Sequence, residues 1–375
     1  MKEKSIWKRL FLQKRSILLV TGLLAVLLLE IAKRNSYFAE EIFAKRIFKG
    51  ISLCISFLTG WIPFSLAECS ILLCPFLLLG ICIAWIRIYK KKRDTFFLFL
   101  NSIYSIACIV SFIFFVYAIG CGINYYRYPF SYYAELTVEP SDAETLYALC
   151  IDLAKQANTL RNQLKTEDEN GVYELPFSTK ELAEQAKEAY EQLAEQYPIL
   201  AGNYPAPKSV WLSKYMSYTR LTGIYTCWTM EANVNIDIPE YSIGSTMTHE
   251  LAHLRGFIRE DEANYLAYLA CMASNSPDLQ YSGTMLALIL SGNALYRKNP
   301  DLYAGLRATY SDGIVRDMVA NSAYWEKYQE TVIGETASKA NDAYLKANNQ
   351  TDGVESYGRM VDLLLASYKK NKESK

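Results

Sequence analysis

Residues 246–271 read TMTHELAHLRGFIREDEANYLAYLAC. They contain the pattern His-Glu-x-x-His at His249, Glu250 and His253. Positions four residues apart share one face of a helix, so the two imidazoles can bind one cation, and Glu250 lies beside them to accept a proton from a bound water. The chain has only two histidines and both are here, which argues against an incidental pattern. The stretch predicts one Zn²⁺ ion and peptide-bond hydrolysis, with Glu250 as the general base.

The third metal ligand is expected downstream of this pattern. Gly256 is well placed to end the first helix and reverse the chain. Glu260 and Asn264 then share a face of the next helix, so we expect Glu260 to bind the metal and Asn264 to hydrogen-bond a ligating histidine. Glu262 is the alternative third ligand. It points about 160° away from Glu260 on an ideal helix, so it serves only if that helix starts later.

The first third of the chain predicts a membrane region. A helix of about 20 apolar residues crosses the hydrocarbon core of a bilayer, and three runs fit that length. They are Ser16–Ala32, Cys69–Ile88 and Phe96–Ile119. Residues 1–121 also hold 16 Lys and Arg against 6 Asp and Glu, whereas the rest of the chain is acidic. We therefore expect a membrane region over 1–121 and a separate domain over 122–375.

Charge sets the expected topology. The basic N-terminus (Lys2 to Arg15) and the cluster Lys90–Arg93 are both expected on the cytoplasmic side. Three spans satisfy both clusters and place residues 122–375 outside a bacterial plasma membrane. Residues 47–66 are ambiguous as a fourth span, so residues 37–66 are expected to form an outer amphipathic or re-entrant segment.

The remaining two-thirds of the chain predicts a mainly helical α+β domain. Two helices are expected first: one is capped by Ser141 and runs to Leu164, and the other covers Thr179–Tyr197. Strand-forming residues fill Ser209–Asp237, with a turn near Thr222-Gly223, and predict a small mixed or antiparallel sheet. Helical patterns return after Pro239 and continue to the C-terminus.

The His249–Asn264 region resembles the gluzincin metallopeptidases, in which an ExxxD-type motif follows HExxH; Asn264 stands in the place of the Asp. The string Arg259–Asn264 resembles the second motif of membrane-bound zinc proteases. The spacing from His253 to Glu260 is shorter than is usual in gluzincins. It is closer to the metzincin pattern, but Arg259 occupies the third histidine's position, so the metzincin class does not carry over.

Across most of the chain the sequence is similar to a bacterial family of three-span membrane proteins of unknown function with a zincin-like outer domain. The matching pieces are Trp61–Ser65 (WIPFS), Glu231–Asn235 (EANVN), HELAH and Tyr344–Asn348 (YLKAN). This resemblance implies a metallopeptidase-like fold and a metal site made by His249, His253 and an acidic residue within Glu260–Glu262. It implies no known substrate.

Zincins bind an extended peptide along an edge strand above the metal. Glu231–Ile238 is the expected edge strand here, with the substrate-contacting residues Ala232, Asn233, Val234 and Asn235. A peptidase also needs a donor for the transition-state oxyanion, and a Tyr or Arg must serve because no third His exists. The candidates are Tyr281, Tyr296 and Arg307.

The expected partners are a lipid bilayer and a peptide or protein substrate. A nucleic-acid partner is not expected, because the formal net charge is zero and no domain-wide basic excess occurs. The alternative function is a non-catalytic sensor or scaffold domain on a membrane anchor. The intact Glu250 argues against it, since a purely structural metal site needs no base.

Overall fold

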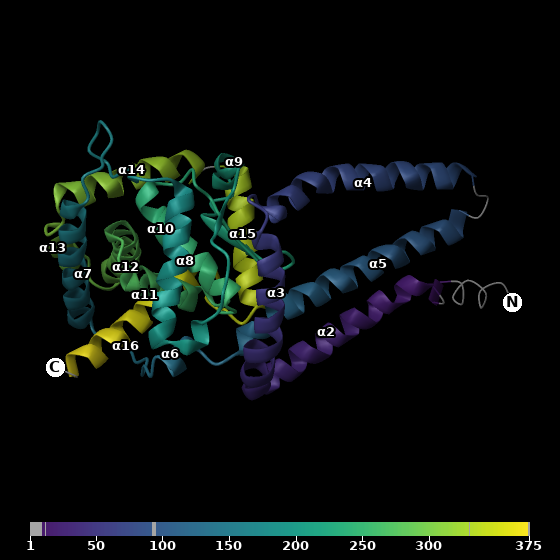
Figure 1. The fold of residues 1–375 in the computed structure, drawn as a ribbon, viewed down its shortest axis with the longest axis horizontal. Coiled ribbons are helices and arrows are strands. Elements are labelled where there is room, and N and C mark those ends of the chain that lie inside the picture. Colours follow the sequence, from purple (N-terminus) through teal and green to yellow (C-terminus); the bar gives the residue numbers. More distant parts are fainter. Residues whose placement is uncertain (1–9, 12, 92–94, 330, 374–375) are drawn as a thin grey trace. The chain divides into compact units, whose positions relative to one another are not determined.

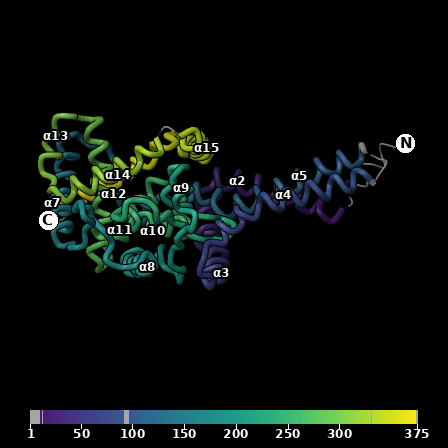
Figure 2. Tube along the Cα trace, turned by 90° about the horizontal axis from the view of Figure 1, so that it is seen from above, coloured from purple at the N-terminus to yellow at the C-terminus, as the bar shows by residue number. Residues whose placement is uncertain are grey.

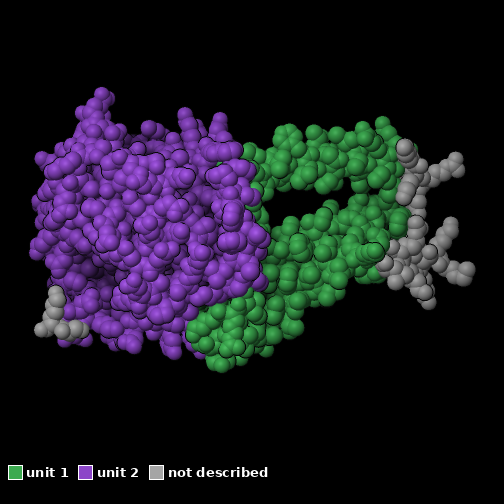
Figure 3. Space-filling model, viewed as in Figure 1, with its two compact units in different colours: residues 1–48, 66–127, 227–229 green, residues 49–65, 128–226, 230–375 purple. Residues whose placement is uncertain are grey.

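The computed structural model describes residues 10–11, 13–91, 95–329 and 331–373. The chain divides into two compact units (Figure 3): unit 1 is residues 1–48, 66–127 and 227–229, and unit 2 is residues 49–65, 128–226 and 230–375. The sequence predicted a single boundary at residue 121. Residues 49–65 instead belong to unit 2. Of the basic clusters used for orientation, Lys2–Arg9 and Lys92–Arg93 lie outside the described residues.

Unit 1 contains the apolar helices. Three helices, Lys14–Arg34, Leu66–Lys90 and Phe96–Gly120, are long and apolar enough to cross a membrane, which confirms the predicted number among the described residues. The elements of unit 1, drawn purple to blue in Figure 1, are η1 (Lys14–Ser16), α2 (Ile17–Arg34), η2 (Phe38–Phe48), α4 (Leu66–Lys91), α5 (Thr95–Gly120) and η3 (Gly122–Tyr126).

Helices α2 and α5 pack closely through small residues. A Cβ added at Gly22 would lie 2.8 Å from Ser111 Cβ, so the glycine permits this approach, as is common between membrane helices. The Tyr104 hydroxyl adds a 2.7 Å hydrogen bond to Ser16 Oγ. The predicted outer segment 37–66 is helical up to Gly60 and then turns: η2 has π-helical geometry and lies in unit 1, whereas α3 (Lys49–Gly60) and the turn 61–65 lie in unit 2.

Unit 2 is mostly helical around a three-stranded sheet. After α3, its elements are α6 (Phe130–Tyr133), α7 (Ala143–Gln163), α8 (Thr179–Gln196), η4 (Pro198–Leu200), β1 (Lys208–Ser209), α9 (Ser213–Ser217), β2 (Gly223–Thr226), β3 (Glu231–Val234), α10 (Glu240–Leu254), α11 (Glu260–Ala273), α12 (Pro277–Lys298), α13 (Pro300–Arg307), α14 (Asp312–Gln329), α15 (Val332–Ala347), η5 (Gly353–Arg359) and α16 (Met360–Glu373). The predicted Ser141 cap is wrong by one residue, because the Asp142 side chain accepts from the Thr145 N–H.

The sheet has the strand order β1-β3-β2. β1 pairs with β3 in parallel, and β2 pairs with β3 in antiparallel register, with Ile224 opposite Asn233. β3 is therefore the central strand and is buried along its length, so the prediction of an edge strand over Ala232–Asn235 is wrong. β1 and β2 are the two edge strands. The turn predicted at Thr222-Gly223 falls later, between Thr226 and Glu231.

Helix α10 forms the centre of unit 2. It contacts α8, α11, α12, β2 and β3, and Figure 2 shows α10 and α11 next to each other. Its residues from Ile243 to Leu254 are buried, polar ones included. The polar side chains of a helix that is buried on all sides need partners inside the protein. Because His249, Glu250 and His253 are buried in this way, they mark a candidate site.

Candidate metal centre

The end of α10 orients His253. Gly256 adopts a left-handed conformation with φ of 85°, and its N–H donates to the His253 carbonyl at 2.9 Å. The Phe257 N–H donates to the Ala252 carbonyl at 3.1 Å, which completes a Schellman motif. The carbonyl of Phe257, which follows the end of the helix, lies 2.8 Å from His253 Nδ1. The glycine predicted to end the helix thus also supplies the turn that holds this imidazole.

Glu260 is the first residue of α11, and its carboxylate faces both histidines. Oε2 of Glu260 lies 3.1 Å from His249 Nε2 and 3.6 Å from His253 Nε2. Two donors bound to one zinc at tetrahedral angles are about 3.3 Å apart, so these spacings suit a shared ion. One potential ligand atom from each of the three residues lies within 4.8 Å of the others.

Glu262 points elsewhere. Its Oε1 accepts hydrogen bonds from the Phe130 N–H at 2.7 Å and from Arg259 at 2.8 Å. The side chain is buried and holds the start of α11 against residue 130. The two candidates for the third ligand therefore separate clearly: Glu260 lies with the histidines, and Glu262 is a structural carboxylate.

Asn264 contacts His249, as the sequence predicted. Its Oδ1 lies 2.8 Å from His249 Nδ1, and its Nδ2 donates to the Tyr357 carbonyl at 3.0 Å. The second bond fixes the orientation of the amide, because only nitrogen can donate to that carbonyl. The oxygen therefore faces the imidazole and accepts a hydrogen bond from the Nδ1–H. This is the outer contact that commonly orients a metal-binding histidine.

The donor set fits a cation. Both Nδ1 atoms face oxygen acceptors, which leaves the Nε2 lone pairs directed toward a carboxylate. Without an ion, a proton must occupy this position. Burial lowers the pKa of His253, but the Glu260 carboxylate outweighs it and raises that pKa to about 9. Burial raises the pKa of Glu260, yet the two histidines lower it to about 2. Two imidazoles and one carboxylate are a common zinc ligand set.

Glu250 lies next to this cluster and is buried. Burial raises the pKa of its carboxyl, partly offset by His249 and His253. Its Oε2 has no hydrogen-bond partner in the described part of the chain, while the Tyr225 N–H of β2 donates to the carboxylate. Gly223 makes room for it, because a Cβ added there would overlap Glu250 Oε1 and lie 2.7 Å from Cγ. A desolvated carboxylate with one oxygen free of hydrogen bonds is suited to accepting a proton.

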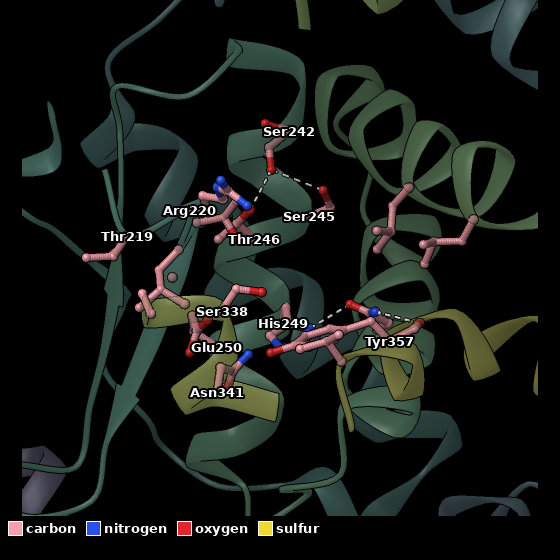
Figure 4. Close-up of a pocket in the computed structure, with 18 residues that line it drawn as sticks. Thr219, Arg220, Ser242, Ser245, Thr246, His249, Glu250, Ser338, Asn341 and Tyr357 are labelled. Atoms are coloured by element: carbon pink, nitrogen blue, oxygen red, sulfur yellow. Dashed lines mark hydrogen bonds between the residues drawn. The ribbon is translucent and has the colours of Figure 1, made fainter. Parts of the chain in front are cut away.

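Tyr357 on η5 is the site residue that sequence reasoning missed. Its ring stacks on His249 with a centroid distance of 6.3 Å. Its hydroxyl is within hydrogen-bonding reach of Glu260 and Asn341. Figure 4 shows Tyr357 beside His249, with Glu250 and Asn341 on the same cavity. Burial, followed by the charge of Glu260, raises the pKa of Tyr357 well above its usual value, so the phenol stays protonated.

None of the three oxyanion donors predicted from the sequence lines this cavity. Tyr281 is fully buried and donates to Asp317 at 2.6 Å. Tyr296 is exposed and packs against Tyr303, and Arg307 is exposed on α13. Those predictions are wrong. Tyr357 lies about a hundred residues beyond the motif, and no spacing rule in the sequence pointed to it.

The cavity has a volume of about 410 Å³. One wall is the segment that leads into β2, the next is α10, and the others come from α12, α15 and η5. The lining is polar near the histidines and apolar at α12. Its residues are Thr219–Gly223, Ser242, Ser245, Thr246, His249, Glu250, Asn264, Leu286, Leu290, Ala337, Ser338, Asn341, Val354 and Tyr357.

Comparison with known proteins gives one match. No curated protein and no solved structure matches the chain. One family model matches residues 43–365, and its description is "Protein of unknown function (DUF3810)". This match spans most of the chain, from η2 to α16, and includes every residue of the histidine–glutamate cluster. The chain therefore belongs to the DUF3810 family.

Proposed function

We propose that this protein is a membrane-anchored zinc metallopeptidase, with unit 2 as a zincin-like domain on the outer face of a bacterial plasma membrane. The observation that supports it most is the cluster itself. The Glu260 carboxylate oxygen lies 3.1 and 3.6 Å from the two imidazole Nε2 atoms, and Glu250 lies beside them with its Oε2 free of a hydrogen-bond partner in the described residues. A purely structural metal site has no use for that fourth group.

In this proposal His249, His253 and Glu260 hold the zinc. Bound zinc would polarise a peptide carbonyl and lower the pKa of water to about 7. Glu250 takes the proton from the attacking water and delivers it to the leaving amine. Asn264 and the Phe257 carbonyl keep both imidazoles in the tautomer whose Nε2 is free to bind metal.

Tyr357 is the proposed donor to the oxyanion. Its phenol faces the cavity and stays protonated because of burial and the nearby Glu260 charge. A neutral hydroxyl that is already oriented in a water-poor site stabilises negative charge as it develops on the substrate oxygen. Asn341 on α15 positions the phenol through the hydrogen bond between their side chains.

The proposed peptide-binding strand is β2. The segment Thr219–Gly223 lines the cavity, and β2 has β3 on only one side. An extended peptide can add to the free edge of such a strand through main-chain hydrogen bonds. This places a substrate backbone beside Glu250, which already accepts from the Tyr225 N–H of the same strand.

Zinc content of the full-length protein tests the proposal. Full-length protein is required, because residues 49–65 belong to unit 2 and a fragment starting at 122 would lack them. We expect one zinc per wild-type chain, none in His253→Ala, clearly less than one in Glu260→Gln, and one in the matched control Glu262→Gln. Wild-type protein without zinc, after metal reconstitution, would support the sensor or scaffold alternative.

A further inference from the structure

Helix α3 in unit 2 has inverted polarity. Its buried face consists of the small polar residues Ser52, Ser56 and Thr59, and Ser52 Oγ donates to the Leu254 carbonyl at 2.8 Å. Its outward face is apolar: Leu58 is 67% exposed, and Phe57 is also exposed. A helix on a water-facing surface normally shows the opposite arrangement. The exposure of Phe57 and Leu58 therefore indicates that this face of α3 is not adapted to contact with water.

The short helix α9 repeats this pattern. Ser213 and Ser217 are buried; Ser213 Oγ donates to the Val210 carbonyl at 2.6 Å, and Ser217 Oγ lies 2.6 Å from the Tyr324 hydroxyl. On the outer side, Trp211 is 70% exposed and Tyr215 is 68% exposed. Two separate segments of unit 2 thus bury serines and expose large apolar or aromatic groups.

The two segments form one surface. The Phe64 and Trp211 rings lie 5.6 Å apart, and the Phe57 and Trp61 rings lie 5.9 Å apart. Trp61 is 77% exposed at the tip of the turn that follows α3. We call this surface the aromatic face, and it consists of Phe57, Leu58, Trp61, Phe64, Trp211 and Tyr215.

Lys208 joins the aromatic face to the sheet of unit 2. Lys208 Nζ donates to the carbonyls of Thr59 at 2.8 Å and Phe64 at 3.1 Å, at the two ends of the turn. The same ammonium pairs with Glu231 at 2.5 Å. Lys208 belongs to β1 and Glu231 to β3, so the turn is fastened directly to the sheet. The exposed rings are therefore presented by a fixed scaffold.

We propose that the aromatic face rests in the interfacial layer of the lipid bilayer. The chain itself argues for this occupant: Leu66 begins a helix long and apolar enough to cross a membrane, and Trp61 lies five residues before it. Five residues span at most about 18 Å, so Trp61 cannot be far from the bilayer surface. Trp and Tyr concentrate in that layer, and the exposed Lys214 can pair with lipid phosphate.

This inference does not depend on the metal site. It gives unit 2 a membrane contact of its own, in addition to the helices of unit 1. It also explains the Trp61–Ser65 stretch, in which Trp61 and Phe64 form part of the face and Ser65 is buried beneath it. Large exposed apolar patches usually mark an interaction surface. A bilayer is the partner favoured here, because the same chain has three helices long and apolar enough to cross a membrane.

Quenching of tryptophan emission by lipids brominated close to the headgroup tests the proposal. The full-length protein is placed in bilayers with Trp211 as the only tryptophan and the other five replaced by Phe. The matched control has all six replaced and carries Tyr296→Trp, at an exposed aromatic position on α12. We expect brominated lipids to quench the emission of Trp211 and to leave the control unquenched.

Equal emission of Trp211 in brominated and ordinary lipids would overturn the proposal and would mean that water or a protein partner covers the face. If the multiply substituted variants do not fold, the wild-type protein provides the same test. Trp211→Phe should then remove part of the lipid-quenchable emission, and Trp325→Phe should remove none. No loss in Trp211→Phe would likewise refute the membrane contact. Neither readout involves zinc or hydrolysis.

Discussion

The pKa of His253 leads to a strong pH dependence of zinc binding. A metal binds the neutral imidazole, so a bound proton competes with it. In the metal-free protein, Glu260 raises the pKa of His253 to about 9 despite burial. Below that pH the group is mostly protonated and zinc binding must expel the proton. Zinc affinity should therefore increase as the pH rises toward 9.

The size of the effect follows from this pKa. With a pKa of about 9, the neutral fraction of His253 rises from about 1% at pH 7 to about 9% at pH 8. This one group should therefore strengthen zinc binding about ninefold over that interval. An imidazole at its ordinary pKa of about 6.5 would change affinity only about 1.3-fold. The same reasoning predicts that His253 releases about one proton for each zinc bound at pH 7.

Calorimetric titration of the metal-free, full-length protein measures both quantities. Zinc is buffered by a chelator, and two pH buffers of different ionisation enthalpy report the released protons. Glu260→Gln removes the charge that raises the pKa, so the pH dependence should shrink together with the affinity, whereas Glu262→Gln should behave like wild type. A wild-type affinity that rises only about 1.3-fold from pH 7 to 8, without proton release, would refute the assigned role of Glu260.

Three further predictions follow from the site. Glu250→Gln should retain zinc and lose peptide hydrolysis by at least about a hundredfold, measured on a quenched-fluorescent peptide mixture; full activity would exclude Glu250 as the base. Gly223→Ala should also retain zinc but reduce turnover about a hundredfold, because the added Cβ displaces the Glu250 carboxylate. In the control Gly292→Ala the added Cβ has no neighbour closer than 3.4 Å, so turnover should change little. Asn264→Ala should weaken zinc affinity about 10- to 100-fold, and an unchanged affinity in the same competition titration would show that His249 needs no such support.

The local sequence pattern was enough to predict those features of the chain that depend on residues close together in the sequence. The three apolar helices follow from continuous runs of apolar side chains, because a bilayer selects length and composition directly. Gly256 ends its helix as expected, since only a residue tolerant of positive φ completes that turn. Glu260 and Asn264 meet the histidines because helical periodicity places them on one face.

Features that depend on distant segments were beyond the reach of local pattern. Strand composition could not say that β3 is central and that β2 is an edge strand, because strand order is set by the pairing of β3 with β1, which lies some twenty residues away. Tyr357 reaches His249 through the packing of η5 against α11 and α15, and α3 is joined to α10 by the hydrogen bond from Ser52 to the Leu254 carbonyl. In each case the position is set by contacts between segments far apart in the chain. Such contacts produce no periodic pattern in the sequence from which they could be predicted.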